Sequence, residues 1–306
     1  MKHSLAITLF LVVLFLATQF VGLKVVDNYI DREKTSQTGV VSYKALPYDI
    51  ERPDISPDLS VWLIVIAMGL GTLVLLVLMK FRKIRLWKLW FFLSVVLTLS
   101  IALSSFMPSA AAFVISLVFA AWKVLKPNVI VHNLTEVFIY GGLAAIFVPI
   151  LNIPAVFVLL VIISAYDMFA VWQSRHMVKM AQFQTDSKLF SGIYIPHSDS
   201  GMKAILGSSI ARSDAGKPHA GSKAGKVRSA VLGGGDMGFP LIFAAVVMKQ
   251  SGFMNALIIP VVTAIALFGL MFFAKKDRFY PAMPFLTAGC FVGYGLIVYV
   301  RPLLLS

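Results

Sequence analysis

The sequence predicts an all-α integral membrane protein with nine transmembrane helices, and its composition already points to this class. Of the 306 residues, 59% are hydrophobic and 13% are charged, whereas about 25% of the residues of soluble domains are charged. The mean hydropathy is +0.86, and the apolar residues gather in runs of about 20, the length that a helix needs to cross a bilayer. Runs of this kind exclude a membrane β-barrel, whose strands alternate apolar and polar residues over about ten positions.

Nine apolar runs follow one another along the chain, and each is long enough to span a bilayer at about 1.5 Å of rise per residue. The runs are residues 4–23, 59–79, 89–107, 109–125, 131–151, 153–173, 230–248, 253–273 and 280–300. The runs on either side of Pro108, and those on either side of Asn152 and Pro154, are predicted to form helical hairpins. A cleaved signal peptide is the alternative for the first run, and it would leave eight spans.

The charged residues predict the orientation of these spans. Twenty of the 27 basic residues lie at the N-terminus and in every second connection between the runs. Cytoplasmic loops carry such an excess because positive charge is retained there during insertion. Residues 24–58 hold five basic and seven acidic residues instead, so we predict that they form an outer loop. The N-terminus is therefore expected in the cytoplasm and the C-terminus outside.

The chain is predicted to divide after the fourth run. Residues 1–125 would form four helices with the outer loop 24–58, and residues 126–306 would form five helices that carry the candidate site described below. Residues 185–229, between the sixth and seventh runs, include six glycines, nine serines and two prolines. This composition predicts a flexible cytoplasmic loop.

Two acidic residues lie within membrane-length runs. Asp167 precedes Arg175 by eight residues and Asp236 follows Arg228 by eight, so each lies about 12 Å from a basic cytoplasmic anchor. A carboxylate at such a depth costs at least ~2.5–3.5 kcal/mol, which makes both residues functional candidates. Two carboxyl groups at the same depth on consecutive helices can meet and share one proton, because both cannot readily be ionised in a low dielectric. Aspartic proteases activate water with such a pair.

Two irregular segments are predicted at the same level as these aspartates. Residues 233–235 are three consecutive glycines, each costing a helix about 1 kcal/mol relative to alanine, and they allow close approach by another backbone. Residues 281–284 contain two prolines within one turn, which leave backbone groups unpaired. Irregular backbone is tolerated in a membrane only where it is buried or lines a wet cavity. The four features therefore predict one polar site near the cytoplasmic end of the bundle.

The order and spacing of these residues resemble the YD, GxGD and PAL motifs of the presenilin and signal peptide peptidase family. The matching residues are Tyr166, Asp167, Gly233, Gly234, Gly235, Asp236, Pro281, Ala282, Met283 and Pro284. The resemblance runs from about residue 133 to the C-terminus, and the compact length is similar to that of archaeal-type homologues. Met283 stands where the motif usually has leucine. Gly234 fills the variable position, where it is expected to widen the substrate cleft.

The resemblance implies an intramembrane aspartyl endopeptidase that cuts transmembrane or signal-type helices, in a prokaryotic, archaeal-type cell membrane. It implies that Asp167 and Asp236 are catalytic and that Tyr166, residues 233–235 and residues 281–284 contact the substrate. The implied partners are membrane-spanning proteins or peptides and the lipid bilayer, and a homo-oligomer is left open. The basic residues cluster in short connections without a basic, aromatic face, so we predict no nucleic-acid partner. No metal or other cofactor is predicted, because the histidines and the single cysteine lack metal-ligand spacing.

The chemistry of a membrane-embedded substrate adds one hypothesis. Helical carbonyls are already hydrogen-bonded, so cleavage requires local unwinding, and an unwound segment in lipid needs new partners. We predict that the substrate pairs as a strand with backbone near residues 281–284 or at the cytoplasmic end of the seventh run.

Other readings of the polar residues stay open. The alternative function is a proton-coupled transporter or cation-leak channel in which Asp167 and Asp236 relay protons or bind ions. Glu136 and His132, near the start of the fifth run, are interpreted as a helix-start carboxylate and an interfacial histidine.

Overall fold

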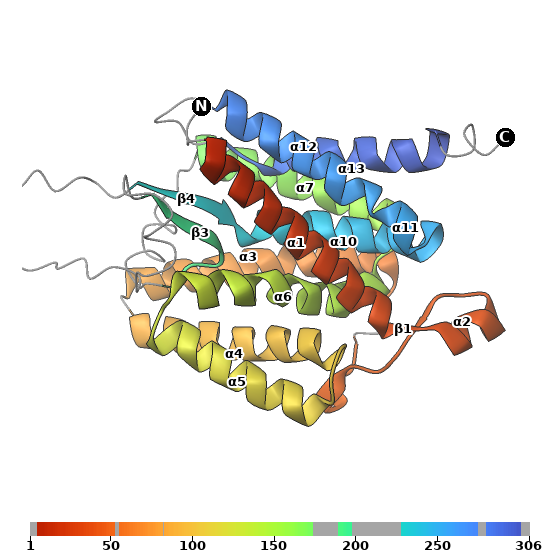
Figure 1. Cartoon of the computed structure of the whole chain (residues 1–306), viewed down its shortest axis with the longest axis horizontal. Coiled ribbons are helices and arrows are strands. Elements are labelled where there is room, and N and C mark those ends of the chain that lie inside the picture. The colour runs from red at the N-terminus through yellow and green to blue at the C-terminus, as the bar shows by residue number, and fades with distance from the viewer. Residues whose placement is uncertain are drawn as a thin grey trace, which may run out of the picture.

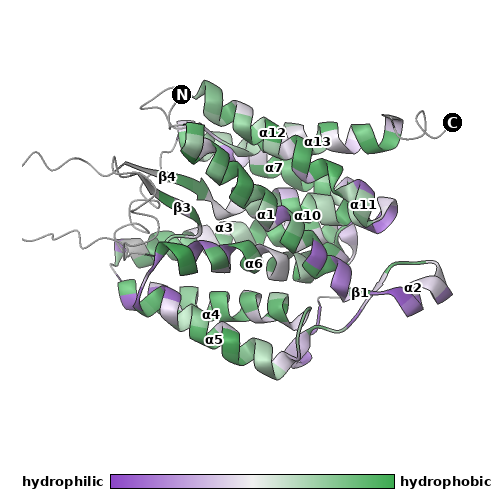
Figure 2. Ribbon diagram, viewed as in Figure 1, coloured by the Kyte–Doolittle hydropathy of each residue, from purple (hydrophilic) through white to green (hydrophobic). Residues whose placement is uncertain are grey.

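The structure is a computed structural model that describes residues 5–52, 55–81, 83–173, 189–197, 228–274 and 280–300. Long helices lie alongside one another (Figure 1), with apolar residues along their length and polar residues gathered toward their ends (Figure 2). The helices are α1 (Leu5–Tyr29), α2 (Arg32–Thr38), α3 (Pro57–Lys80), α4 (Ile84–Ser104), α5 (Ser109–Leu125), α6 (Val129–Phe147), α7 (Ile153–Trp172), α10 (Gly234–Ser251), α11 (Phe253–Ala256), α12 (Ile258–Phe273) and α13 (Met283–Gly295).

Short elements complete the described part of the chain. The 3₁₀ turns are η1 (Pro47–Asp49) and η2 (Val148–Ile150), and the π-helical turn η3 (Leu296–Val300) extends α13. Two antiparallel hairpins pair β1 (Ile30–Asp31) with β2 (Ser42–Tyr43), and β3 (Gly192–His197) with β4 (Arg228–Gly233). The two hairpins lie at opposite ends of the bundle (Figure 1).

Several helices have the length and composition of membrane spans. Six qualify in the described part of the chain: Leu5–Tyr29, Leu59–Leu78, Ile84–Ser104, Val129–Ile150, Ile153–Trp172 and Phe253–Phe273. Two apolar helices, Ser109–Leu125 and Met283–Tyr299, are shorter. All nine predicted runs lie largely in helix, so the prediction of a multi-pass helical membrane protein is confirmed. The count of nine spans and the orientation stay predictions.

The segment before the seventh run differs from the prediction. The run was expected to be helical from residue 230, but β4 extends to Gly233 and α10 begins at Gly234. Within the predicted flexible loop, residues 192–197 form β3, with Ile193 and Ile195 buried. The apolar side chains of β3 recur with the period of two that a half-buried strand requires. Most of the remaining predicted loop lies outside the described residues.

Helix α10 occupies the centre of the bundle. It contacts α1, α6, α7, α12 and α13, and from Met237 to Met248 nearly every residue is buried. A helix that is apolar on all sides is buried in a protein core or covered by lipid, and the burial of α10 shows that other helices cover it. Asp236, in the first turn of α10, is therefore carried by a helix that its neighbours enclose.

A cluster of aromatic rings joins α10 to α7 and α13. Phe157 of α7 stacks on Phe291 of α13 with ring centroids 4.5 Å apart, and it meets Phe243 of α10 edge-on at 5.1 Å. Tyr294 of α13 also packs edge-on against Phe157, at 5.3 Å. Such pairs add about 0.5–1.5 kcal/mol each beyond the apolar area that they bury. The cluster fixes the relative position of the three helices that carry the predicted site.

Helix α1 packs on this central unit. It contacts α6, α12 and α10, and its side chains Leu11 and Phe15 are fully buried in the main core. Residues 1–125 therefore contribute two helices to the main core, because Val61 and Ile64 of α3 are buried in it as well. Helices α4 and α5, on either side of Pro108, pack against each other, and α4 also packs against α6.

The irregular backbone at the far end of α10 is held by a lysine. The Nζ of Lys249 donates hydrogen bonds to the carbonyl oxygens of Val148, at 2.9 Å, and Leu151, at 2.6 Å. These carbonyls belong to η2 and the short connection to α7, where regular helical bonding stops. Lys249 therefore satisfies acceptors that would otherwise face an apolar environment.

We expect Lys249→Met to lower the free energy of unfolding by about 1–3 kcal/mol, because buried carbonyls lose their donor. Thermal unfolding in detergent measures the change. Lys24→Met is the matched control, since Lys24 is half exposed and pairs with Asp27 at 2.9 Å; an exposed ion pair contributes less than about 1 kcal/mol. Equal losses of stability in the two variants would contradict the assigned role of Lys249.

Candidate functional site

Asp167 lies against the beginning of α13. Its Oδ2 accepts a hydrogen bond from the backbone N–H of Met283 at 3.1 Å, and the backbone N–H of Ala282 also donates to this carboxyl group. The residue is 5% exposed. The first amides of a helix have no partner within the helix and favour a carboxylate. The backbone groups that were predicted to be unpaired beside the two prolines are thus bound by the first predicted aspartate.

The two prolines bracket this start of α13. Pro284 lies in the first turn of the helix, where its missing N–H would have had no partner. Pro281 precedes the helix and is buried. About one helical turn away from this contact, the hydroxyl of Ser164 on α7 lies 2.8 Å from that of Thr287 on α13. The contact between α7 and α13 is therefore set by polar interactions at two successive levels.

Asp236 lies beside Asp167, in the first turn of α10. The backbone of Gly233 lies against its carboxyl group, and Asp167 is near enough for its charge to act on this carboxyl group. Helices α7, α10 and α13 contact one another pairwise. The structure thus brings Asp167, Asp236 and the 281–284 segment together at one end of these three helices, the end that carries β3 and β4 (Figure 1).

The three glycines form a junction between strand and helix. Gly233 ends β4, and Gly234 opens α10 with its N–H donating to the carbonyl of Ser191 at 3.2 Å. A Cβ atom on Gly234 would lie 2.7 Å from Tyr140 Oη and 2.9 Å from Ser191 Oγ. The expectation that Gly234 widens the substrate cleft is therefore wrong, because Tyr140 and Ser191 fill the space beside it. A Cβ on Gly235 would meet the Phe239 ring at an ordinary 3.6 Å.

The remaining predicted site residues differ in exposure. Met283 is 3% exposed and faces the protein interior. Ala282 is half-buried, as is Tyr166, which precedes Asp167 on α7.

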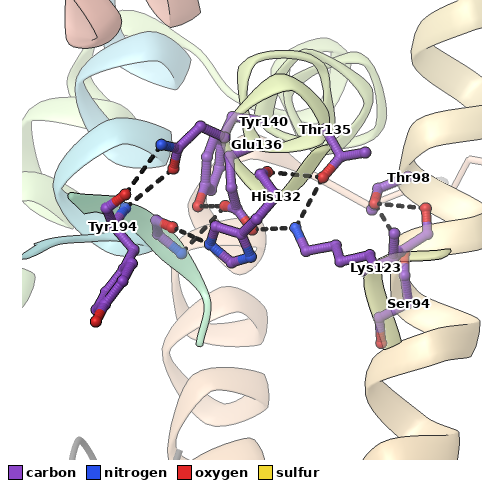
Figure 3. Close-up of polar contacts among 11 residues, drawn as sticks. Ser94, Thr98, Lys123, His132, Thr135, Glu136, Tyr140 and Tyr194 are labelled. Atoms are coloured by element: carbon purple, nitrogen blue, oxygen red, sulfur yellow. Dashed lines mark hydrogen bonds and ion pairs between the residues drawn. The ribbon is translucent and has the colours of Figure 1, made fainter. Parts of the chain in front are cut away.

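A buried polar cluster beside the site was not predicted. Glu136 and Lys123 are each 1% exposed, and Nζ of Lys123 lies 2.5 Å from Oε1 of Glu136 (Figure 3). Lys123 is one of the 20 basic residues counted toward the cytoplasmic connections, and the sequence interpretation of Glu136 and His132 is a helix-start carboxylate and an interfacial histidine. Lys123 instead lies in the last turn of α5 and His132 is buried. Opposite charges near the ends of adjacent apolar runs were the signal that could have revealed this pair.

We expect Gly234→Ala to lower the melting temperature, because its Cβ would overlap Tyr140 and Ser191; overpacking of this kind costs about 1–3 kcal/mol. Gly238→Ala is the matched control on the same helix, where a Cβ would lie 3.5 Å from Tyr140. Since alanine favours a helix over glycine by about 1 kcal/mol, the control is expected to be neutral or stabilising. Thermal unfolding of both variants tests this, and equal stability would contradict the close contact at Gly234.

Comparison with known proteins shows the family of the chain and relatives of its fold. The family model of signal-peptide peptidases and presenilin aspartyl proteases matches residues 43–301, whereas no curated protein matches the chain. The fold is similar to two solved structures, in space groups C222 and P2, of a presenilin family intramembrane aspartate protease. The first has a TM-score of 0.60 and 19% identity and covers 96% of this chain and 99% of its own. The second has a TM-score of 0.58 and 20% identity, with coverages of 95% and 96%. Because the family model covers most of the sequence, the chain belongs to the signal-peptide peptidase and presenilin family of aspartyl proteases.

Proposed function

We propose that the protein hydrolyses peptide bonds of transmembrane or signal-type helices within the bilayer, with Asp167 and Asp236 as the catalytic pair. One observation carries this proposal. The two carboxyl groups lie near enough at one end of three contacting helices for one charge to act on the other, and Asp167 also accepts a hydrogen bond from the start of α13. Placing two carboxyl groups within a membrane costs free energy, so such residues are usually functional.

The proposed reaction needs one proton shared between the two aspartates. The ionised carboxylate takes a proton from water, whose oxygen attacks the carbonyl carbon of the scissile bond, while the protonated partner gives its proton to the carbonyl oxygen. The tetrahedral intermediate then collapses. The aspartate that took the proton from water gives it to the leaving nitrogen as the C–N bond breaks, and a hydroxyl of the intermediate gives its proton to the other aspartate as the new carboxyl group forms. The pair returns to its starting protonation state, so no cofactor is required.

Strand β4 is the proposed docking edge for the unwound substrate. The backbone groups of Gly192 and Tyr194 in β3 are bonded to side chains of α6 and so point away from β4. In an antiparallel pair, the residues directly opposite them in β4 likewise have backbone N–H and C=O groups that point away from the partner strand β3. These residues are Gly233 and Val231, and Val231 is 42% exposed. A strand added at this edge would lead to Asp236.

The 281–284 segment is the less favoured docking site. The N–H of Met283 is already bound to Asp167, so pairing there would have to break a contact of the catalytic pair. Pro281 and Pro284 also lack N–H groups that a partner strand could use.

We further propose nine spans, with the N-terminus and the β3–β4 hairpin on the cytoplasmic side of a prokaryotic cell membrane. The excess of basic residues in alternate connections supports this orientation. The family supports proteolysis over the alternative of a proton-coupled transporter or cation-leak channel.

We expect Asp167→Asn and Asp236→Asn each to abolish cleavage of a labelled transmembrane peptide in liposomes, because asparagine can neither take nor give the shared proton. Mass spectrometry of the products measures this. Asp27→Asn is the control: Asp27 is 7% exposed but pairs with Lys24 and Arg32 at the other end of α1. Ion flux that both active-site substitutions stop, without any cleaved peptide from the wild-type protein, would favour the transporter.

We expect Val231→Pro to slow cleavage strongly, because proline removes the outward N–H of β4 while leaving the bonds to β3 intact. Val231→Ala keeps that N–H and should cleave at nearly the wild-type rate. Circular dichroism and the melting temperature show whether both variants fold. Equal cleavage by the two folded variants would rule out β4 as the docking strand.

A further inference from the structure

Three polar side chains of α6 contact the backbone of β3 and take the place of a neighbouring strand. Glu136 accepts the N–H of Gly192 at 3.1 Å, and Nε2 of His132 lies 2.7 Å from the Gly192 carbonyl oxygen. Asn133 accepts the N–H of Tyr194 at 3.0 Å and donates to its carbonyl at 2.9 Å. Both backbone groups of two alternate residues are thereby satisfied, as in a sheet (Figure 3). Helix α6 therefore closes one edge of the hairpin, and among the described residues no further strand pairs with the β4 edge.

The carboxylate of Glu136 has several partners, all of them buried. Its Oε1 faces the ammonium of Lys123, and its Oε2 accepts hydrogen bonds from the Gly192 N–H and the Tyr140 hydroxyl. Lys123 also donates to Thr135 at 3.0 Å. A buried ion pair of this kind is often no more stabilising than two apolar side chains of similar volume. The ion pair with Lys123 by itself therefore gives no stability reason for a carboxylate at residue 136, which leaves its other contacts to account for it.

Two series of contacts connect Glu136 to the segment that carries Asp236. The first passes through Gly192, whose φ of +134° and close approach to the Leu232 carbonyl leave no room for a side chain, and along β4 to Gly233. The second passes through Tyr140, whose hydroxyl also bonds to Ser191 and lies beside Gly234. Both routes end at the junction of strand and helix that carries Asp236. A single carboxylate thus holds both sides of the junction.

We propose that Glu136 is a positioning residue for proteolysis, and that it sets which peptide bond of the docked substrate lies opposite Asp236. It does so by holding β3, through Gly192, and the start of α10, through Tyr140. Lys123 neutralises the carboxylate so that it can stay buried. This inference rests on the proposed protease function, and it adds that cleavage position depends on an acceptor at residue 136 rather than on the ion pair.

Two double substitutions separate these roles. Lys123→Met with Glu136→Gln removes both charges but keeps an acceptor oxygen at residue 136. Lys123→Met with Glu136→Met also removes both charges, but it leaves the Gly192 N–H and the Tyr140 hydroxyl without an acceptor oxygen at residue 136. Neither variant leaves an unpaired buried charge, so the two differ mainly in the acceptor. The measurements are the cleavage rate and the distribution of products, by mass spectrometry, from one labelled transmembrane peptide.

The glutamine variant is expected to cut at the wild-type bond. The methionine variant is expected to cut about tenfold more slowly or worse, since small misplacements of reacting groups have such effects, and to spread its products over neighbouring bonds. Wild-type rate and product distribution in both folded variants would overturn the proposal. So would a slower rate with unchanged products in both, since this would indicate a role for the ion pair in stability alone.

A second measurement does not depend on activity or on the double variants folding well. Tyr140→Phe removes one hydroxyl contact of Glu136, and Tyr29→Phe is its control, since the buried Tyr29 hydroxyl donates to Ile101 at 2.8 Å in another part of the bundle. Hydrogen exchange of residues 189–197 and 230–236 should quicken in Tyr140→Phe and not in Tyr29→Phe. Unchanged exchange in both overturns the proposal. Quickened exchange in a protein that never cleaves would uphold the positioning contact and reject the protease function.

Discussion

The structure depends on one constraint: backbone that is not helical must find hydrogen-bonding partners within the protein when it lies at membrane depth. Two segments break regular helix near the same end of the bundle, the β3–β4 hairpin and the start of α13. Side chains satisfy the β3 edge of the hairpin, which α6 binds, and the start of α13, where Asp167 accepts the N–H of Met283. The polar residues of the site therefore support irregular backbone as well as providing the candidate chemistry.

Helices α7, α10 and α13 make apolar contacts toward one end of the bundle and polar contacts toward the other. Away from the aspartates, α7, α10 and α13 meet through the rings of Phe157, Phe243 and Phe291. Toward the hairpin they meet through carboxyl groups, hydroxyls and backbone amides. Within a bilayer, van der Waals packing of side chains such as these rings holds helices together, so the other end can hold groups that are costly to bury. A protease that admits water and an unwound substrate within a membrane needs this division.

Membership in the signal-peptide peptidase and presenilin family gives the arrangement a function. In that setting the β4 edge and the pair of aspartates adjoin each other, since Gly233 ends the strand and lies against Asp236. In the proposed reaction, the substrate would thus be bound and cut by adjoining parts of one segment. In the same proposal, Glu136 would connect the support of this segment to the position of the cut.

The sequence by itself determined the membrane class, the helical runs and the residues of the three motifs, because hydrophobic length and the cost of a buried charge are local properties of a chain. It did not predict the hairpin, since strands as short as β3 and β4 exist only through pairing between residues that are far apart in the sequence, such as Gly192 and Gly233. It also did not predict the ion pair of Lys123 and Glu136. Charges near the ends of apolar runs are typical of a membrane surface, and only the packing of α5 against α6 brings these two together. Only the tertiary structure decided that Gly234 faces Tyr140 rather than an open cleft. Which groups a residue meets depends on how helices pack, and packing is a property of the whole chain.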